Sequence, residues 1–163
     1  MRRIITLVAI VFVSLANAQA FKGKGDMKLQ VGATLQEHAA GIATTYDYGL
    51  GENISIGGQI SYLLNTTNAV GTPKFDDRFD AKFRFNANIG NVLKISDKFD
   101  VYPGLDLGLR NFGAHLGARY FFTNGFGIYT EAGIPLAKYN TNAEGYERLN
   151  NQFVFQIGAS FNL

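Results

Sequence analysis

The chain of 163 residues contains no cysteine and no tryptophan, and it has only three prolines and two histidines. Without cysteine it has no disulfide framework, no thiol nucleophile, no thiolate metal site and no cysteine that could carry a lipid anchor. Two isolated histidines do not supply the ligand set of a zinc site. No spacing of Ser, His and Asp marks a catalytic triad. The sequence therefore predicts no catalytic residue, no metal site and no cofactor.

Charge is also scarce. Charged residues make up 17% of the chain, below the roughly 25% typical of soluble domains. Lys and Arg number 15 and Asp and Glu number 13, so the chain lacks the basic excess that nucleic-acid binding requires. After the N-terminal region no stretch of about 20 residues is free of glycine and charge, and the sequence therefore predicts no later membrane-spanning helix.

The first 18 residues have the features of a secretory signal peptide. Arg2 and Arg3 give a positive start, a mostly apolar run extends from Ile4 to Ala16, and Ala16-Asn17-Ala18 supplies small residues for cleavage. We therefore expect residues 1–18 to be removed and residues 19–163 to form one domain. Loss of the two arginines leaves equal numbers of acidic and basic residues.

The remaining sequence alternates with a period of two, which is typical of β-strands. In the first segment Met27, Leu29 and Val31 lie on one face, and Lys28 and Gln30 lie on the other. The alternating segments are residues 27–36, 42–50, 54–64, 81–90, 99–110, 114–122, 126–136 and 153–163. Their apolar faces carry no charged residue. Each segment has about the length that a tilted strand needs to cross a bilayer.

Glycine indicates which face points inward. Many of the 19 glycines fall on the polar faces, where they would weaken a solvated strand. The interior of an eight-stranded barrel is only just wide enough for side chains, so long polar residues there must alternate with glycine. We therefore predict an all-β fold, an eight-stranded antiparallel up-and-down transmembrane β-barrel with a plugged polar lumen. The alternative is a soluble barrel with an apolar pocket, in which the apolar face of every strand points inward and the polar face points outward.

Aromatic residues on the apolar face gather at one end of the threaded strands. Membrane barrels carry aromatic girdles at both interfaces, and Tyr and Phe can serve there without Trp. The predicted periplasmic girdle consists of Tyr48, Phe99, Tyr120, Phe122, Phe126 and Phe161. Connections are short at this end and longer at the other, where the two longest are residues 65–79 and 137–150. This asymmetry is typical of bacterial outer-membrane barrels.

Charged residues of the polar face form a predicted lumen charge network. Its members are Arg119, Asp106, Glu131, Arg84, Arg110 and Lys82. If segments 99–110 and 114–122 pair across residues 111–114, Arg110 faces His115 and Asp106 faces Arg119. Glu131 then lies opposite or diagonal to Arg119. We expect Arg119 between two carboxylates, with Arg84 nearby, as a structural plug or as a gating salt bridge.

Three stretches, residues 49–55, 85–92 and 158–163, are similar to an uncharacterised group of small barrel proteins from Bacteroidota. The whole architecture resembles small outer-membrane barrels, the class of outer-membrane protein X and of the membrane domain of outer-membrane protein A. The resemblance implies a Gram-negative outer membrane, contact with its lipids and lipopolysaccharide, and insertion by the barrel assembly machinery. That machinery would read Phe161 and Leu163, although such barrels commonly end in an aromatic residue.

The longer loops carry the candidate binding residues, because recognition is often placed on loops of a rigid scaffold. These residues are Asp76, Asp77, Arg78, Tyr139 and Tyr146. Asp76 and Asp77 with Asp80 are a weaker candidate for a divalent cation that could bridge lipopolysaccharide. The leading hypothesis is a monomeric, non-enzymatic envelope protein with a structural or surface-interaction role. The alternatives are a narrow gated pore for ions or small solutes, and a lipid-modifying enzyme that uses His115 near Arg110 at the outer rim.

Overall fold

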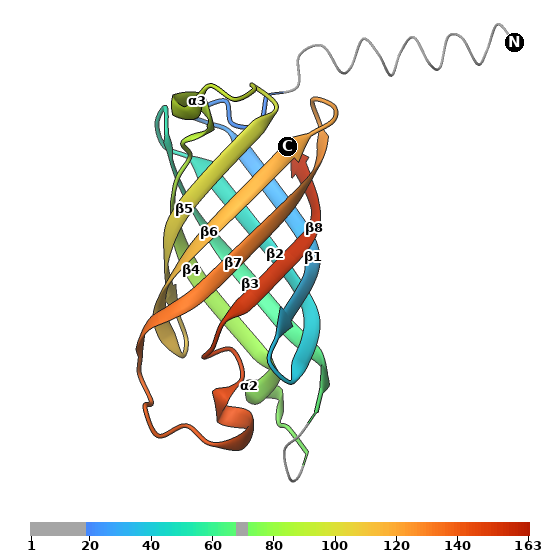
Figure 1. Cartoon of the computed structure of the whole chain (residues 1–163), viewed down its shortest axis with the longest axis vertical. Coiled ribbons are helices and arrows are strands. Elements are labelled where there is room, and N and C mark those ends of the chain that lie inside the picture. The colour runs from blue at the N-terminus through green and yellow to red at the C-terminus, as the bar shows by residue number, and fades with distance from the viewer. Residues whose placement is uncertain (1–18, 68–71) are drawn as a thin grey trace, which may run out of the picture.

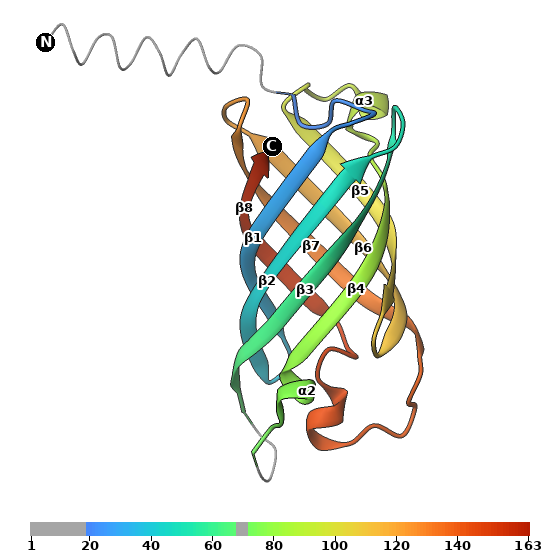
Figure 2. The same cartoon turned by 180° about the vertical axis from the view of Figure 1, so that it is seen from behind.

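The alternating segments close on themselves in the computed structural model, which describes residues 19–67 and 72–163 (Figure 1, Figure 2). Each strand pairs antiparallel with its sequence neighbour, and the last strand pairs with the first to complete a barrel. The strands are β1 (Met27–Gln36), β2 (Ala39–Gly49), β3 (Ile54–Thr66), β4 (Phe79–Ala87), β5 (Phe99–Gly108), β6 (Asn111–Phe121), β7 (Phe126–Lys138) and β8 (Val154–Asn162). The predicted fold class is confirmed, whereas the predicted signal peptide lies outside the described residues.

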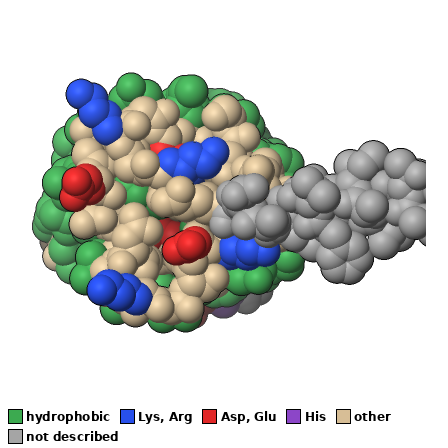
Figure 3. Space-filling model, turned by 90° about the horizontal axis from the view of Figure 1, so that it is seen from above, with side chains coloured by type: hydrophobic (Ala, Val, Ile, Leu, Met, Phe, Trp, Pro, Cys, Tyr) green, Lys and Arg blue, Asp and Glu red, His purple; other side chains and the backbone are tan. Residues whose placement is uncertain are grey.

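The barrel is apolar outside and polar inside, the reverse of a soluble domain. Ile60, Phe83 and Leu116 are exposed on the outer wall, while Lys28 and Arg84 are buried. Seen from the end that holds the termini, hydrophobic side chains surround the perimeter, and the middle is mostly backbone and polar groups (Figure 3). Alternation along each strand produces this sorting, because successive side chains point to opposite faces of the wall.

The two ends of the barrel differ in their connections. At the end that holds the termini, residues 50–53 and 122–125 form short turns, and residues 88–98 contain α3 (Gly90–Leu93) (Figure 1). The opposite end has two longer connections, which contain α2 (Phe75–Arg78) and the 3-10 helix η1 (Gly145–Arg148). Within the described parts of the chain, neither α2 nor α3 is long and apolar enough to cross a membrane.

The fourth strand ends earlier than the alternation predicts. The expected segment runs to Gly90, but β4 stops at Ala87 and the chain turns into α3. The Gly90 amide donates to Asp100 Oδ1 at 3.0 Å. A side chain at position 90 would overlap the backbone of Phe99 and Asp100. Gly90 therefore marks a close approach of the chain to β5 rather than a strand position.

The pairing of β5 with β6 differs from the predicted one. A two-residue turn at positions 109–110 joins the strands, so Asp106 is paired with Gly113, and Arg119 with Asp100. His115 faces Gly104 instead of Arg110. Asn111 accounts for the shift because it is buried and donates to Asn150 O at 2.9 Å, which makes it the first residue of β6 rather than part of a turn.

The shortest ladder of the barrel joins β4 to β5. Only Lys82–Asn86 and Gly104–Gly108 are paired there, whereas the ladder between β6 and β7 extends along the whole of β6. Strand pairs of a closed barrel normally satisfy every backbone group. This seam is therefore the part of the wall that depends most on side chains.

Pro103 limits the ladder at this seam. The Ile89 amide donates to Val101 O at 2.9 Å, and the Leu109 amide donates to Ala81 O at 3.2 Å, so odd-numbered residues of β5 direct their backbone groups toward β4. Pro103 belongs to this odd-numbered set but has no N–H to donate. The ladder consequently loses a hydrogen bond beside the last paired residue, Gly104.

We predict that hydrogen exchange will distinguish the two edges of β5. The amides of Leu105 and Leu107 face β4, and those of Gly104 and Asp106 face β6, so each residue has an internal control next to it. The amides of Leu105 and Leu107 should exchange faster, because the shorter β4–β5 ladder opens locally more often than the longer β5–β6 ladder. Residue-resolved exchange by NMR in detergent micelles measures this difference. Equal protection of the two pairs would contradict a weak β4–β5 seam.

Candidate functional site

Arg84 lies at the centre of the lumen and is fully buried. Its Nη2 donates to Glu131 Oε2 at 2.6 Å, and its Nη1 donates to Gln59 Oε1 at 3.1 Å. Its Nε lies 3.4 Å from Asp47 Oδ1. Arg84 therefore binds two carboxylates from opposite parts of the wall. The prediction that Arg119 holds this position is wrong, because the register of β5 and β6 pairs Arg119 with Asp100, and Glu131 binds Arg84 instead.

His115 belongs to the same cluster. Its Nδ1 lies 3.0 Å from Asp106 Oδ1, and its Nε2 lies 2.8 Å from Asn86 Oδ1 and 3.1 Å from Arg84 Nη2. The imidazole is buried, and it occupies the space that a side chain at Gly104 would need. The structure thus places His115 inside the lumen rather than beside Arg110 at the outer rim. The rim-enzyme hypothesis loses the residue on which it depended.

Arg119 forms a second ionic group nearer the end that holds the termini. Its Nη2 donates to Asp100 Oδ2 and to Asn88 Oδ1, both at 2.7 Å. The guanidinium carbon lies 4.7 Å from the centroid of the Tyr102 ring, within the range of a cation–π contact. Arg119 is thus neutralised by Asp100, and Asp106 and Glu131 bind His115 and Arg84 instead.

Tyr102 separates the two ionic groups. Its ring is buried and lies directly over Gly117, where a Cβ atom would overlap the ring. The Tyr102 hydroxyl accepts a hydrogen bond from Gln30 Nε2 at 3.1 Å, and Gln30 Oε1 accepts one from Thr45 at 2.8 Å. An aromatic residue on the polar face was not among the predicted site residues, although its place in the alternation put it inside.

The end of the barrel that holds the termini is stoppered by residues preceding β1. Ala20 and Phe21 are buried, and the Ala20 amide donates to Asp97 O at 2.7 Å. The Phe21 centroid lies 5.9 Å from both Lys28 Nζ and the Arg119 guanidinium carbon. Asp26 forms a buried ion pair with Lys28. Strand alternation does not predict this stopper, because these residues precede the first alternating segment.

The opposite end is closed by the connection between β7 and β8. Leu149, Asn150 and Asn151 are buried, and Asn150 Nδ2 donates to Asp77 O at 3.4 Å. Arg110 does not reach the central cluster. It donates to Asp76 O and, at 3.4 Å, to Glu147 O, so it fastens α2 to η1.

The other predicted residues have different environments. Lys82 is half-buried and packs over Gly108 near this closed end. Asp76 and Tyr139 are exposed, and Asp77, Arg78 and Tyr146 are half-buried. Asp80 is buried, whereas Asp76 is exposed. Among the residues that the structure describes, no group of three or more His, Asp or Glu side chains could hold a metal ion, which counts against the cation site suggested for Asp76, Asp77 and Asp80.

Aromatic residues form a continuous row outside the stoppered end. Ring centroids are 5.4 Å apart for Tyr120 and Phe122, 6.2 Å for Phe122 and Phe126, and 5.7 Å for Phe126 and Phe161. Phe99 is paired with Tyr120, and Tyr48 lies near the same end of β2. At the other end Phe75 of α2 packs on Tyr62 and Phe79, a contact that strand alternation does not predict.

Eight antiparallel strands, an apolar outer wall and a buried ionic lumen define a β-barrel of the transmembrane type. The chain belongs to a family described as "Family of unknown function (DUF6646)", whose model matches residues 10–163. Among solved structures it is similar to a protein reported under "De novo design of transmembrane beta-barrels" at 10% identity and a TM-score of 0.58, with 87% of this chain and 98% of that chain covered. No curated protein matches the chain. The structural likeness supports the fold.

We predict that Arg84→Ala destabilises the barrel more than Arg119→Ala. The first change leaves Glu131 and Asp47 buried without their cation, and the second removes the cation of Asp100 alone. Loss of one partner from a buried ion pair costs about 3–5 kcal/mol. Urea unfolding in detergent, followed by gel migration, measures both changes. Arg110→Ala, which removes a loop contact, is the control. Equal midpoints for Arg84→Ala and wild type would contradict the central role of Arg84.

Glycine positions in the lumen give a second prediction. Gly117→Ala should destabilise the barrel by about 1–3 kcal/mol, the usual cost of overpacking, because the new methyl group would overlap the Tyr102 ring. Gly133→Ala is the matched control, since its nearest neighbour would be the Ala114 carbonyl oxygen at 3.8 Å. The same unfolding measurement applies to both. Equal stability of the two variants would show that Tyr102 does not rest on Gly117 in the folded barrel.

Proposed function

We propose that this chain is a small Gram-negative outer-membrane barrel of the outer-membrane protein X type with a structural or surface-interaction role. The observation that carries the proposal is the combination of an apolar outer wall with a lumen filled by Arg84, Tyr102 and Arg119 and covered at both ends. A wall of this kind suits lipid. Because the lumen is filled, it has no space for a ligand, and any binding partner would contact the loops instead.

The closed lumen argues against the other two candidate functions. A pore would require Arg84, Arg119 and the Phe21 stopper to leave their partners together. A lipid-modifying enzyme would need accessible acid–base groups at the rim, and His115 is buried among Asp106, Asn86 and Arg84. We therefore propose a non-enzymatic protein. Sustained conductance of the wild type in planar bilayers would favour the pore instead.

The loop end provides a defined surface for interaction. Arg110 fastens α2 to η1, and Asn150 bonds to both Gln36 and the carbonyl of Asp77. Two connections far apart in sequence are thereby held in one arrangement. Asp76 and Tyr139 are exposed there, with Asp77, Arg78 and Tyr146 half-buried beside them. We propose this group as the binding surface for lipopolysaccharide or a protein partner.

The remaining features fit export and insertion of a monomer. Residues 1–18 would serve as the signal peptide. The row from Tyr120 to Phe161, with Phe99 and Tyr48, would form the periplasmic girdle in contact with outer-membrane lipids. Phe161 and Leu163 would be read by the barrel assembly machinery. We also propose, from the resemblance of residues 49–55, 85–92 and 158–163, that the protein is related to the small barrel proteins of Bacteroidota.

Cysteine labelling tests the location and the orientation, because the native chain has no cysteine and gives no background. Tyr139→Cys, in the proposed extracellular loop, should react with a membrane-impermeant maleimide on intact cells. Glu52→Cys, in a turn at the other end, should react only after the outer membrane is permeabilised. Labelling of Glu52→Cys alone on intact cells would invert the orientation. Labelling of both only after the inner membrane is broken would contradict an outer-membrane location.

A further inference from the structure

The connection between β4 and β5 exposes an unexpected group of apolar side chains. Val92, Leu93 and Ile95 are 62%, 47% and 65% exposed, although they lie beyond the strands and outside the apolar wall. A connection that met only water would have little reason to carry three such residues within four positions. Burial of these side chains therefore requires a surface outside the barrel.

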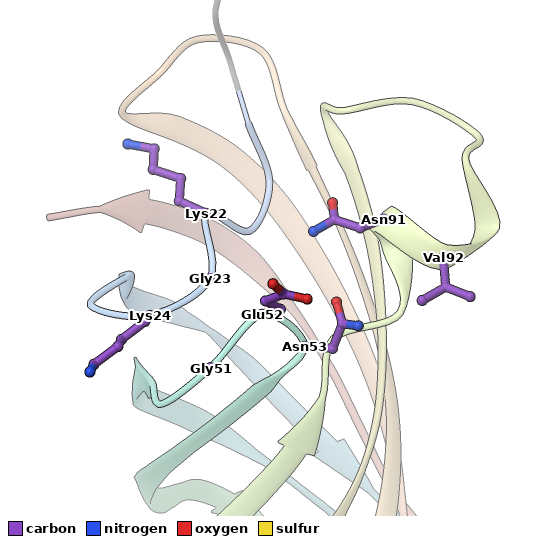
Figure 4. Close-up of a pocket in the computed structure, with 8 residues that line it drawn as sticks. All are labelled: Lys22, Gly23, Lys24, Gly51, Glu52, Asn53, Asn91 and Val92. Atoms are coloured by element: carbon purple, nitrogen blue, oxygen red, sulfur yellow. The ribbon is translucent and has the colours of Figure 1, made fainter.

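The orientation of this connection is fixed by the barrel. The Gly90 amide donates to Asp100 Oδ1, and Lys94 ends α3 with a left-handed φ of 50°. Asn91 extends toward Glu52 and Asn53 across the cavity beside the barrel mouth, and Val92 lines the same cavity from the other side of α3 (Figure 4). The polar side of the short helix, that of Asn91, therefore faces the mouth, whereas Leu93 and Ile95 are not among the residues that line this cavity.

The surroundings match a lipid–water boundary. Phe99, the first residue of β5, continues the chain into the aromatic row. Exposed Leu50 lies in another turn at this end of the barrel. Lys22, Lys24 and Lys94 are exposed at the same end of the barrel. Apolar side chains next to lysines are typical of interfacial segments, in which the lysines reach the phosphates of lipid headgroups.

We infer that residues 92–95 form an interfacial anchor that inserts Val92, Leu93 and Ile95 into the lipid leaflet at the end of the barrel that holds the termini. This inference rests on the proposed membrane location. The apolar group lies at the same end of the barrel as the aromatic row of the lipid-facing wall, and the lysines complement anionic headgroups. Three side chains are too small a surface for a stable protein partner, since specific interfaces bury about 800 Å² on each side.

The anchor has a mechanical role in the wall. It lies at one end of the β4–β5 seam, where the ladder is shortest and Pro103 lacks a donor. Side chains held in the leaflet resist separation of the two strands at this end. The Arg84 cluster, which joins β4 to β7 and to His115 of β6, connects the wall across the lumen from inside.

Tryptophan fluorescence tests the anchor, because the native chain has no tryptophan. Val92→Trp, Ile95→Trp, Asn91→Trp and Phe126→Trp would be reconstituted in phosphatidylethanolamine and phosphatidylglycerol vesicles with brominated acyl chains. Emission of the first two should fall roughly two-fold, since an interfacial apolar face lies about 5–10 Å into the headgroup boundary. Asn91→Trp, on the polar side of α3, is the matched control and should be quenched by iodide from water. Phe126→Trp reports whether the barrel itself is inserted.

Each other outcome overturns the anchor. If Phe126→Trp is quenched by the lipid and the first two variants only by iodide, the connection lies in water and the membrane barrel stands. If the first two are shielded from both quenchers, a protein or a second copy covers them. If Phe126→Trp is not quenched by lipid, the membrane location fails as well. Nitroxide labels on Val92→Cys and Ile95→Cys repeat the comparison where a tryptophan variant does not fold.

Discussion

The structure depends on the neutralisation of one buried cation. Arg84 has no access to water, and its charge is balanced by Glu131 and Asp47 and by the polar oxygens around them. An isolated ionised group in such a space would cost several kcal/mol even after relaxation. Because its partners come from β2, β3 and β7, the same neutralisation also holds opposite sides of the wall at fixed separations.

Filling of the lumen explains the unusual composition. Arg84, Arg119, Tyr102 and His115 are too large to share a narrow barrel with ordinary side chains on every strand. Gly117 and Gly104 have no side chain, and the Tyr102 and His115 rings occupy the space that a Cβ atom at these positions would need. Apolar residues are then needed only on the outside, which is where a bilayer would solvate them. Abundant glycine, sparse charge and strict alternation are thus consequences of one arrangement.

The sequence predicted the wall and the charged residues Arg84, Asp106, Arg119 and Glu131 inside it, but not how these charges pair. Alternation identified all eight strands, because the outer face of each strand carries no charged residue. Ile60 and Phe83 are examples of the apolar residues on this face. The partner of Arg119 depended on whether Asn111 begins a strand or belongs to a turn, and long-range bonds to Asn150 and Asn151 decide that. Phe21 and Val92 lie outside the alternating segments, so no periodic signal could assign them a place. Sequence periodicity specifies faces, whereas register and packing depend on contacts between distant residues.

The Phe21 stopper has a consequence for the order of assembly. Phe21 precedes β1, yet its ring packs with Arg119 of β6, and the rings of Phe21 and of buried Phe121 both lie near the Lys28 ammonium. Contacts between residues this far apart form only after the intervening chain has been organised. The contact between Phe21 and Arg119 therefore forms only once β6 is organised, so this end of the barrel closes late relative to the pairing of the early strands.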